Sequence, residues 1–360
     1  MKLDILMLTR WFVSWNGASR AVYHIAQALT RLGHRARILT YSGYIDKSWQ
    51  RICEVYPIRA HTHNWLSLFR ISKLIHKLDP DVIHSHGLLG FASWLAKRSY
   101  ISTYHGTGTL GMTTSSRIFV ATMYFYVPSI LDLRLAKVVT TVSKYMGSII
   151  KNFYGVKSVH IIPNGIESNF LLRKLDYSKR RYITFMGSIT EWKAKYLVEI
   201  IRRFHERYHN KVDNYQFVVI GPIRNLRIYQ QLKKLEKLNT WVYGYASDEE
   251  KLKLLDLSRV FILPSQVENL PISILEAYAR GVPAIAFKVG GIPEIVKHNT
   301  TGYLVKPFDV NSFVHYIYNI MIDDKLYRTL SSNCLTFAKN YTWDSIVKKY
   351  LNLYLHILST

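Results

Sequence analysis

Short apolar runs that read as strands alternate with helical segments along almost the whole chain, and this order restricts the fold more than any other feature. The first helical segment would end at Gly33, and its apolar residues recur at helical spacing, at Val22, Ile25, Ala26 and Leu29. Alternating strands and helices form parallel sheets that are covered by helices on both faces. The predicted fold class is therefore α/β.

The series of strands and helices begins twice, which indicates two sheets. We expect strands within residues 3–9, 35–41, 81–86, 100–105, 137–143 and 159–165, and again within 182–188, 216–221, 240–245, 259–265 and 282–287. The turn sequence Pro163-Asn164-Gly165 suits a linker, so we place the boundary directly after it. Parallel sheets bind ligands at the carboxyl ends of their strands, and two facing sheets would form a cleft.

Composition supports two globular domains and points to an anionic partner. The chain has 360 residues, 49% of them hydrophobic, which excludes a disordered protein. Its 48 Lys and Arg residues against 24 Asp and Glu residues give a net charge of +24, and both halves of the chain are basic. Nucleic acid, an anionic membrane surface and a phosphorylated substrate would each explain this charge.

The compartment follows from the cysteines and the N-terminus. Cys53 and Cys334 lie far apart and lack metal-ligand spacing, which favours a reducing compartment and no zinc site. The first residues, MKLDILMLTR, enter a strand without the apolar region and cleavage site of a signal peptide. We therefore expect a cytoplasmic protein.

Two glutamates frame the stretch ENLPISILE, residues 268–276. Pro271 suits the first turn of a helix that Gly281 would end, so Glu268 would lie in the loop before this helix. Helical side chains tilt toward the N-terminus, which would bring the Glu276 carboxylate back toward the same ligand. The helix N-terminus suits a phosphate, and the carboxylates suit hydroxyl groups. The pattern favours a site for a sugar on a nucleotide diphosphate, whereas an isolated pair would more simply be surface glutamates.

The pair stands within a longer resemblance. ENLPISILEAYARGVPAIAF, KVGGIPEIV and TGYLV resemble the C-terminal domain of the retaining glycosyltransferases of family 4, also called glycosyl transferases group 1. Further similar segments are NGASRAVYHIAQALTRLGH, DPDVIHSHG, STYHG, TTVSKYMGSI, IIPNGIE, FMGSITEWKAK and YTWDSIVKKY, so the resemblance covers nearly the whole chain. It implies the GT-B fold, in which two Rossmann-like domains with parallel sheets face each other across an interdomain cleft.

This resemblance implies a domain for each substrate. Residues 1–165 would bind the acceptor, residues 166–342 the nucleotide sugar, and residues 343–360 would form a helix that packs back on the first domain. The reaction would move a sugar from a nucleotide-diphosphate sugar to an acceptor with retention of configuration. The family resembled usually needs no metal, no Asp-x-Asp pair stands at a plausible loop end, and no cofactor is expected beyond the donor substrate.

The resemblance also assigns donor-binding residues. Glu276 would hydrogen-bond the ribose of the donor nucleotide. Glu268, with the backbone of Asn269, Leu270 and Pro271, would hold the donor sugar. The helix that begins near Pro271 would direct its positive end toward the departing diphosphate.

The diphosphate clamp departs from the family pattern. Lys193 aligns with the lysine that neutralises the pyrophosphate, a role that suits a flexible ammonium. The usual arginine would follow Gly187 directly, but Ser188 stands there and supplies only a hydroxyl. Arg202 or Lys195 would have to compensate, or turnover would be slower.

The first half of the chain holds three candidate parts of the active site. Asn16-Gly17 resembles the double-glycine loop that approaches the donor phosphate or the acceptor, and Asn16 would keep the turn because asparagine tolerates left-handed dihedrals. His105 matches the active-site histidine near the reacting sugar, although a lone histidine after a strand is more often structural. His84 and His86 would point to opposite sides of a strand end, one packed and one lining the cleft.

One motif competes with this interpretation. Residues 106–111, GTGTLG, fit the G-x-G-x-x-G pattern of nicotinamide-nucleotide binding. No helix follows at once, and Asp132 precedes the next strand instead of ending it. We interpret the segment as a loop beside His105 that would close over an acceptor.

The acceptor is less defined. Residues 64–78, NWLSLFRISKLIHKL, combine apolar and basic side chains and would suit an anionic membrane surface. The apolar run at residues 118–131 is too short to span a bilayer, and a buried helix is its simpler interpretation. Peripheral association with a membrane and a lipid-linked or other glycan acceptor form the working hypothesis.

Two other functions stay open at this point. A sugar-nucleotide epimerase can share the two-domain architecture and would need no acceptor. A non-enzymatic protein that binds an anionic polymer would explain the charge, but no nucleic-acid module is recognisable and the paired glutamates would have no role.

Overall fold

The computed structural model describes residues 1–359 except 14–15, 42, 44, 51–52, 60–65, 88, 107–126 and 172–175. Their contacts divide the chain into two compact units. Unit 1 consists of Met1–Gly165 together with Trp343–Thr360, and unit 2 of Ile166–Thr342.

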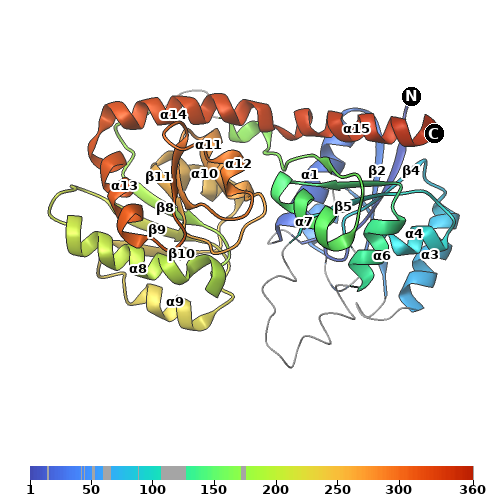
Figure 1. The fold of residues 1–360 in the computed structure, drawn as a ribbon, viewed down its shortest axis with the longest axis horizontal. Helices are drawn as coiled ribbons and strands as arrows, with labels where there is room; N and C mark the ends of the chain where they lie inside the picture. Colours follow the sequence, from blue (N-terminus) through green and yellow to red (C-terminus); the bar gives the residue numbers. More distant parts are fainter. Residues whose placement is uncertain are drawn as a thin grey trace. The chain divides into compact units, whose positions relative to one another are not determined.

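Unit 1 is built on a parallel sheet with strand order β3-β2-β1-β4-β5-β6-β7 (Figure 1). The strands are β1 (Asp4–Leu8), β2 (Arg35–Tyr41), β3 (Glu54–Ile58), β4 (Val82–Ser85), β5 (Ile101–Tyr104), β6 (Val138–Thr141) and β7 (His160–Ile161). The helices are α1 (Gly17–Arg31), α2 (Lys47–Gln50), α3 (Leu66–Leu78), α4 (Phe91–Leu95), α6 (Val127–Leu135), α7 (Lys144–Tyr154) and α15 (Trp343–Ser359).

Both faces of this sheet are buried, because successive strand residues point to opposite sides. In β1, Ile5 and Met7 join a core with α1 and α15, whereas Leu6 and Leu8 join a second core with α3 and α4. The four apolar residues predicted to share one face of α1 are all almost completely buried. The near-continuous apolar character of the strands is thus explained by two covered faces.

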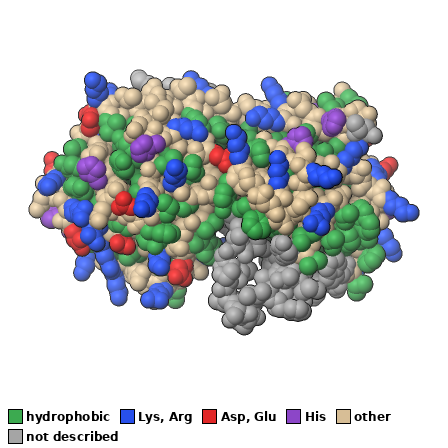
Figure 2. All heavy atoms as spheres, in the orientation of Figure 1, with side chains coloured by type: hydrophobic (Ala, Val, Ile, Leu, Met, Phe, Trp, Pro, Cys, Tyr) green, Lys and Arg blue, Asp and Glu red, His purple; other side chains and the backbone are tan. Residues whose placement is uncertain are grey.

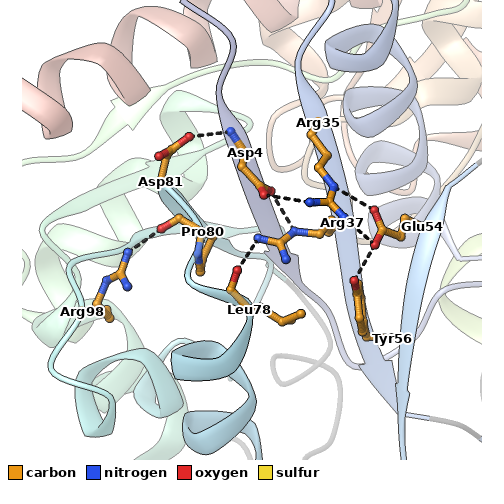
Figure 3. A network of polar contacts seen from close by, with 9 residues as sticks. All are labelled: Asp4, Arg35, Arg37, Glu54, Tyr56, Leu78, Pro80, Asp81 and Arg98. Atoms are coloured by element: carbon orange, nitrogen blue, oxygen red, sulfur yellow. Dashed lines mark hydrogen bonds and ion pairs between the residues drawn. The ribbon is translucent and has the colours of Figure 1, made fainter.

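A network of polar side chains links the amino ends of neighbouring strands in unit 1 (Figure 3). The Asp4 carboxylate on β1 accepts hydrogen bonds from Arg35 and Arg37 on β2, and Arg35 continues to Glu54 on β3. The Arg37 side chain is only 3% exposed, so its buried positive charge must be stabilised by the Asp4 carboxylate and the carbonyl of Leu78. This network lies at the end of the sheet opposite to the ligand-binding edge expected for parallel strands.

Unit 2 has a parallel sheet with strand order β10-β9-β8-β11-β12-β13. Its strands are β8 (Tyr182–Met186), β9 (Gln216–Ile220), β10 (Thr240–Gly244), β11 (Ser258–Leu263), β12 (Ala284–Phe287) and β13 (Gly302–Val305). Its helices are α8 (Glu191–Tyr208), α9 (Leu226–Lys233), α10 (Asp248–Asp256), α11 (Ile272–Ala279), α12 (Ile292–Ile295), α13 (Val310–Ile322) and α14 (Asp324–Ala338).

In unit 2, successive strands are added to the sheet first on one side of β8 and then on its other side. The chain runs from β8 outward to β10 and then returns to β11 on the other side of β8. Because crossovers between parallel strands are right-handed, α8 and α9 cover one face and α11 the other, where α14 packs on it (Figure 1). The loops after β8 and β11 therefore diverge at a topological switch point, where sheets of this kind bind ligands.

The prediction of two parallel α/β sheets is confirmed, and all of the predicted strand segments contain a strand. Two strands were not predicted, β3 and β13, which lie at the edges of their sheets. β3 contains Pro57, and proline within a strand is tolerated at an edge, where its missing N–H breaks no central ladder.

Candidate active site

The loop that joins β11 to α11 holds the first predicted glutamate. Glu268, Asn269 and Leu270 are each 5–7% exposed. Pro271 is the N-cap of α11, one position before the first turn in which the sequence placed it, and Gly281 follows the helix with a φ of 67°, as predicted. The loop is therefore a packed part of the unit and holds its side chains in place.

Gly290 supports this loop from the segment after β12. Its φ is 53°, and a Cβ atom there would lie 1.8 Å from the Glu268 carbonyl oxygen. The same carbonyl accepts a hydrogen bond from the Gly291 N–H at 3.2 Å. Only glycine permits this approach, which explains the first of the two glycines in KVGGIPEIV.

Glu276 lies on α11, where all residues from Ile274 to Ala279 are buried. Its side chain belongs to a residue that is 5% exposed. The alternative that Glu276 is a surface residue is therefore wrong. A carboxylate on an otherwise apolar buried helix is costly unless a partner or a ligand engages it.

Lys193, in the first turn of α8, forms an ion pair with Glu268. Its Nζ lies 2.6 Å from Glu268 Oε1, and the side chains are 26% and 9% exposed. Lys193 follows the loop after β8, and Glu268 lies in the loop after the neighbouring strand β11. A hydrogen bond from the Gln266 N–H to the Trp192 carbonyl, at 2.8 Å, ties the same two segments together. The structure thus brings together two residues that the sequence assigned to the diphosphate and the sugar.

The loop that contains Gly187 and Ser188 lies beside the loop after β9. Ile189 and Ile223 form a β-bridge, and the Arg224 N–H donates to the Ile189 carbonyl at 3.1 Å. The backbone of Arg224 is therefore anchored next to the position where the family arginine is missing. Sequence reasoning did not find Arg224, because it lies 36 residues from Ser188 and only strand pairing joins them.

Lys195 and Arg202 are poorly placed to replace that arginine. They lie two and nine residues beyond Lys193 on α8, and both are exposed. At about 100° per residue, each is turned about 160–200° around the helix from Lys193. The expectation that one of them compensates is not supported by the helix geometry.

In unit 1, Asn16 precedes α1 with a φ of −106°, and its side-chain oxygen accepts the Ser19 N–H at 3.1 Å. Gly17 is the first residue of the helix and is exposed. The expectation of a left-handed turn at Asn16 is wrong: the asparagine is an N-cap, for which an extended backbone is usual.

His84 within β4, His86 directly after it and His105 directly after β5 form one cluster. His105 Nε2 lies 3.0 Å from His86 Nδ1, and the rings of His86 and His84 are 4.0 Å apart. His84 contacts the Tyr354 hydroxyl of α15 through Nδ1, at 2.8 Å, and Thr103 Oγ1 through Nε2, at 2.6 Å. The expectation that His84 and His86 point to opposite sides is wrong, because residues two apart in a strand share a face.

Burial keeps these imidazoles neutral. His84 is fully buried and His86 is 6% exposed. Burial lowers the pKa of His84 to about 3 and that of His105 to about 4, and it holds the pKa of His86 well below its ordinary value. The nearby imidazoles oppose protonation of His84 and His86 further.

Ser85 points to the other face of the sheet and belongs to a separate polar group. Its hydroxyl donates to Asp132 Oδ1 at 3.2 Å, and the Ser102 hydroxyl donates to Oδ2 of the same carboxylate. The Gly90 N–H is a third donor. Burial outweighs these neutral donors and raises the pKa of Asp132 to about 6.

Some predicted features lie outside the described residues. They are residues 107–111 of the GTGTLG segment, residues 118–126 of the apolar run, and Asn64 and Trp65 of the basic amphipathic stretch. Within the part of the chain that the structure describes, no helix has the length and apolar character needed to cross a bilayer.

Known proteins match the chain over both units. Residues 15–170 match the sequence profile described as Glycosyltransferase Family 4, and residues 171–335 match that of Glycosyl transferases group 1. The chain belongs to this glycosyltransferase family. Its members transfer a sugar from a nucleotide sugar, which agrees with the function predicted for the paired glutamates, and the chain is accordingly an enzyme of the glycosyltransferase class.

A relative from Escherichia coli is the UDP-Gal:alpha-D-GlcNAc-diphosphoundecaprenol alpha-1,3-galactosyltransferase. It is 26% identical over 290 residues, which are 74% of this chain and 73% of that protein. Among solved structures, a glycosyltransferase from Rickettsia africae matches with a TM-score of 0.80, 19% identity and 99% of both chains covered. HepE from Anabaena, in complex with UDP and glucose, matches with a TM-score of 0.78 and 17% identity, over 98% of this chain and 99% of that one. These two structures share the GT-B fold with this family member.

Proposed function

We propose that this family 4 enzyme is a retaining, metal-independent glycosyltransferase whose unit 2 binds a UDP-sugar donor and whose unit 1 binds the acceptor. The observation that carries the proposal is the ion pair between Lys193 and Glu268 at the switch point of the unit 2 sheet, beside the helix that bears Glu276. The names of the E. coli relative and of the HepE complex support uridine as the base.

The glutamates serve the two sugar rings of the donor. Glu276 accepts hydrogen bonds from the ribose hydroxyls, because its carboxylate is a double acceptor held rigidly on a buried helix. Glu268 and the backbone of Asn269, Leu270 and Pro271 bind the hydroxyls of the transferred sugar. Gly290 keeps the Glu268 backbone in position for this contact.

The diphosphate is held by positive charge from three sources. Lys193 supplies an ammonium, and the N-terminus of α11 supplies unpaired N–H groups after Pro271. Arg224 is the candidate for the second cation, since its backbone is bonded to the loop of Ser188. Gly187 and Ser188 contribute close backbone approach and a hydroxyl. Asn16 and Gly17 are the proposed contacts from unit 1.

Retention follows if the acceptor attacks the face from which the diphosphate departs. The bond between the anomeric carbon and the diphosphate oxygen breaks, and the acceptor oxygen forms the new bond on the same side. The acceptor proton passes to an oxygen of the departing diphosphate. Positive charge beside the diphosphate is catalytic because it stabilises the negative charge that develops there, and His105 contacts the sugar that is transferred.

Nucleotide-dependent stabilisation tests the donor assignment. Melting temperatures are measured with UDP, GDP, ADP and uridine for the wild type, Glu276→Gln and Lys193→Met. UDP is expected to stabilise the wild type most, because a ligand that binds only the folded state at 100 times its Kd adds about 2.7 kcal/mol. Glu276→Gln should lower the affinity for UDP and for uridine to the same extent. Lys193→Met should lower the affinity for UDP at least tenfold and leave the affinity for uridine unchanged.

Glu199→Gln is the matched control, because Glu199 is an exposed glutamate of α8 away from the proposed site. It should retain the response of the wild type to every nucleotide. If UDP stabilised Glu276→Gln as strongly as the wild type, the ribose role would be wrong. If no nucleotide shifted the wild type, donor binding by unit 2 would be wrong.

The acceptor is proposed to carry an anionic lipid-linked group. The E. coli relative acts on a sugar joined through a diphosphate to undecaprenol, as its name states. In unit 1 of this chain, an open surface cavity of about 360 Å³ is lined by Ile45 and by the exposed residues Lys47, Gln50, Pro57 and Arg59. Its two cations suit a phosphate group.

Helix α3, which comes after the cavity-lining residues in the sequence, has a surface that suits a membrane. Arg70 of α3 donates a hydrogen bond to the Arg59 carbonyl at 3.4 Å, which joins the helix to the cavity wall. The outward face of α3 combines Leu66 and Phe69, 66% and 56% exposed, with the exposed cations Lys73 and Lys77. An apolar stripe flanked by lysines binds the interface of an anionic bilayer. We therefore propose peripheral association with a membrane through α3.

A further inference from the structure

The ion pair between Lys193 and Glu268 joins two groups that the proposed function assigns to different parts of the donor. A hydrogen bond of 2.6 Å joins Lys193 Nζ to Glu268 Oε1, and neither side chain has a further polar partner among the described residues. Their opposite charges cancel. A donor whose diphosphate binds Lys193 and whose sugar binds Glu268 must therefore replace or share this contact.

Glu268 is the fixed partner of the pair, and Lys193 is the movable one. The Glu268 backbone is confined by Gly290, where an added Cβ would lie 1.8 Å from the Glu268 carbonyl oxygen. The Lys193 side chain is 26% exposed and has a flexible four-carbon stem. A Cβ added at Gly187 would lie 3.7 Å from Lys193 Cδ, so the stem runs past the loop of Ser188. Rotation of the stem would carry the ammonium from Glu268 to an anion at that loop.

Glu268 and a diphosphate would compete for this ammonium. The Glu268 side chain is only 9% exposed, so its carboxylate is destabilised when its cation leaves. A diphosphate bound at Lys193 would also be repelled by the negative charge of Glu268. Hydroxyls of the transferred sugar remove this conflict, because they donate hydrogen bonds to the carboxylate and leave the ammonium to the diphosphate. UDP lacks that sugar and offers Glu268 no such donor.

We propose that Glu268 is a specificity-determining residue that makes the site prefer the sugar donor to the nucleoside diphosphate product, because it exchanges Lys193 with the diphosphate. With the sugar bound, Glu268 accepts from the sugar hydroxyls and Lys193 binds the diphosphate. After the sugar has moved to the acceptor, Glu268 takes Lys193 back and the diphosphate leaves more readily. The inference rests on the proposed function, in which unit 2 binds the diphosphate at Lys193.

A role of Glu268 that was only to orient Lys193 predicts the opposite sign. If Glu268 merely held the ammonium in place for the diphosphate, its loss would lower the affinity for UDP. If the two anions compete, the loss of the carboxylate frees the ammonium and raises the affinity for UDP. The direction of the change therefore separates the two roles.

Isothermal titration calorimetry with UDP, UDP-glucose, UDP-galactose and uridine compares the wild type with Glu268→Gln, which keeps the side-chain shape and removes its charge. The affinity for UDP should rise about threefold or more, since even exposed ion pairs contribute up to about a factor of five. The affinity for the UDP-sugar that the wild type binds more tightly should fall, and that for uridine should not change. A lower or unchanged affinity for UDP would overturn the proposal, as would an equal rise for UDP and its sugars.

Lys193→Met provides an independent measurement. In the wild-type background, it should lower the affinity for the UDP-sugar more than that for UDP, because only the sugar frees the ammonium from Glu268. In the Glu268→Gln background, it should lower the affinity for UDP more than it does in the wild type. Equal losses of UDP affinity in the two backgrounds would show that the residues act independently, and the exchange would be wrong.

Glu236→Gln is the matched control. Glu236 forms an ion pair of the same length, 2.6 Å, with Lys233 at the end of α9, in the segment that leads to the amino end of β10. The ligand-binding edge expected for parallel strands is the opposite one. This variant should bind UDP and the UDP-sugars as the wild type does.

The outcome is separable from that of the donor assignment. If the wild type bound UDP and Glu268→Gln lowered that affinity, the exchange would be refuted and the proposed function would stand. If neither protein bound UDP or a UDP-sugar, donor binding by unit 2 and the exchange would both be wrong.

Discussion

At the scale of single residues, buried charges in this enzyme differ in what neutralises them. Arg280 forms two hydrogen bonds to Asp256, at 2.6 and 2.7 Å. Arg180 has carbonyl oxygens instead, including that of Arg280 at 2.7 Å, where the negative end of α11 favours a cation. Burial raises the pKa of Asp132, and its three donors are neutral groups whose hydrogen bonds lower the pKa by less than burial raises it.

Asp132→Asn should stabilise the protein at high pH. A raised folded pKa means that the stability present below the ordinary pKa of 3.8 is lost as pH rises through about 6. The neutral amide avoids this loss, and Ser102 can turn its hydroxyl to accept from it. The gain in free energy of unfolding should be up to about 3 kcal/mol at pH 8 and smaller by about 1 kcal/mol at pH 5.

Urea unfolding at pH 5 and pH 8 measures this difference in the free energy of unfolding. The buried histidines change stability with pH in the opposite direction, but they are present in both proteins, so their effect cancels when the variant is compared with the wild type. Asp132→Ala should be less stable than Asp132→Asn at either pH, because it leaves Ser85, Ser102 and the Gly90 N–H without their acceptor. A gain for Asp132→Asn that did not change with pH would contradict the raised pKa.

At the scale of elements, α15 is a helix from the end of the chain that completes the core of unit 1. Its buried residues recur at helical spacing and are Trp343, Ile346, Val347, Tyr350, Tyr354 and Ile357. Trp343 stacks on His24 of α1, with ring centroids 5.7 Å apart, and Tyr354 bonds to His84. The same helix thus packs against the histidine cluster and against Gly165 at the end of the first segment.

Gly165→Ala should destabilise unit 1 by about 1–3 kcal/mol, because the new Cβ would lie 2.8 Å from the Trp343 indole and force it to move. Thermal and urea unfolding measure the effect. Gly43→Ala is the control, since a Cβ there would meet no atom of the described residues within 4 Å. The cost of Gly165→Ala should shrink when Trp343 is replaced by leucine, and equal costs in both backgrounds would show that the two residues do not interact.

At the scale of the whole molecule, the net charge of +24 is the property that any partner meets first. Lys and Arg side chains are spread over the face drawn in Figure 2, and Asp and Glu side chains are sparser. A charge of this size attracts anionic surfaces at long range and loses that attraction as salt shortens the Debye length. In the proposed membrane association, long-range attraction would bring the protein to the charged surface, and the apolar side chains of α3 would supply the short-range contact.

Vesicle flotation tests this division of roles. The protein should float with vesicles that contain phosphatidylglycerol and not with pure phosphatidylcholine, and binding should fall when salt rises from about 0.1 M to about 1 M. Leu66→Ser with Phe69→Ser should weaken binding several-fold. Phe153→Ser, which changes a 69% exposed phenylalanine of α7, is the control and should bind as the wild type does. Binding that ignored both salt and the α3 substitutions would contradict peripheral association through this helix.

Local patterns in the sequence predicted much of the fold. The apolar spacing in α1, the left-handed Gly281 after α11 and the interior strands are set by residues within a few positions of one another. β3 and β13 were missed because their apolar runs are interrupted: β3 contains Glu54 and Pro57, and β13 begins at Gly302. Asn16 was misread because one polar side chain can serve a left-handed turn or a helix cap, and only the backbone distinguishes them.

The sequence by itself determined the fold class, the family and the types of side chain available for the reaction, because these depend on short-range periodicity and on motifs. The tertiary structure alone decided which of those side chains meet. Lys193 and Glu268 are 75 residues apart, and His84 and Tyr354 are 270 apart. Parallel strands that pair across long crossovers place their carboxyl ends side by side, and no local pattern records that neighbourhood.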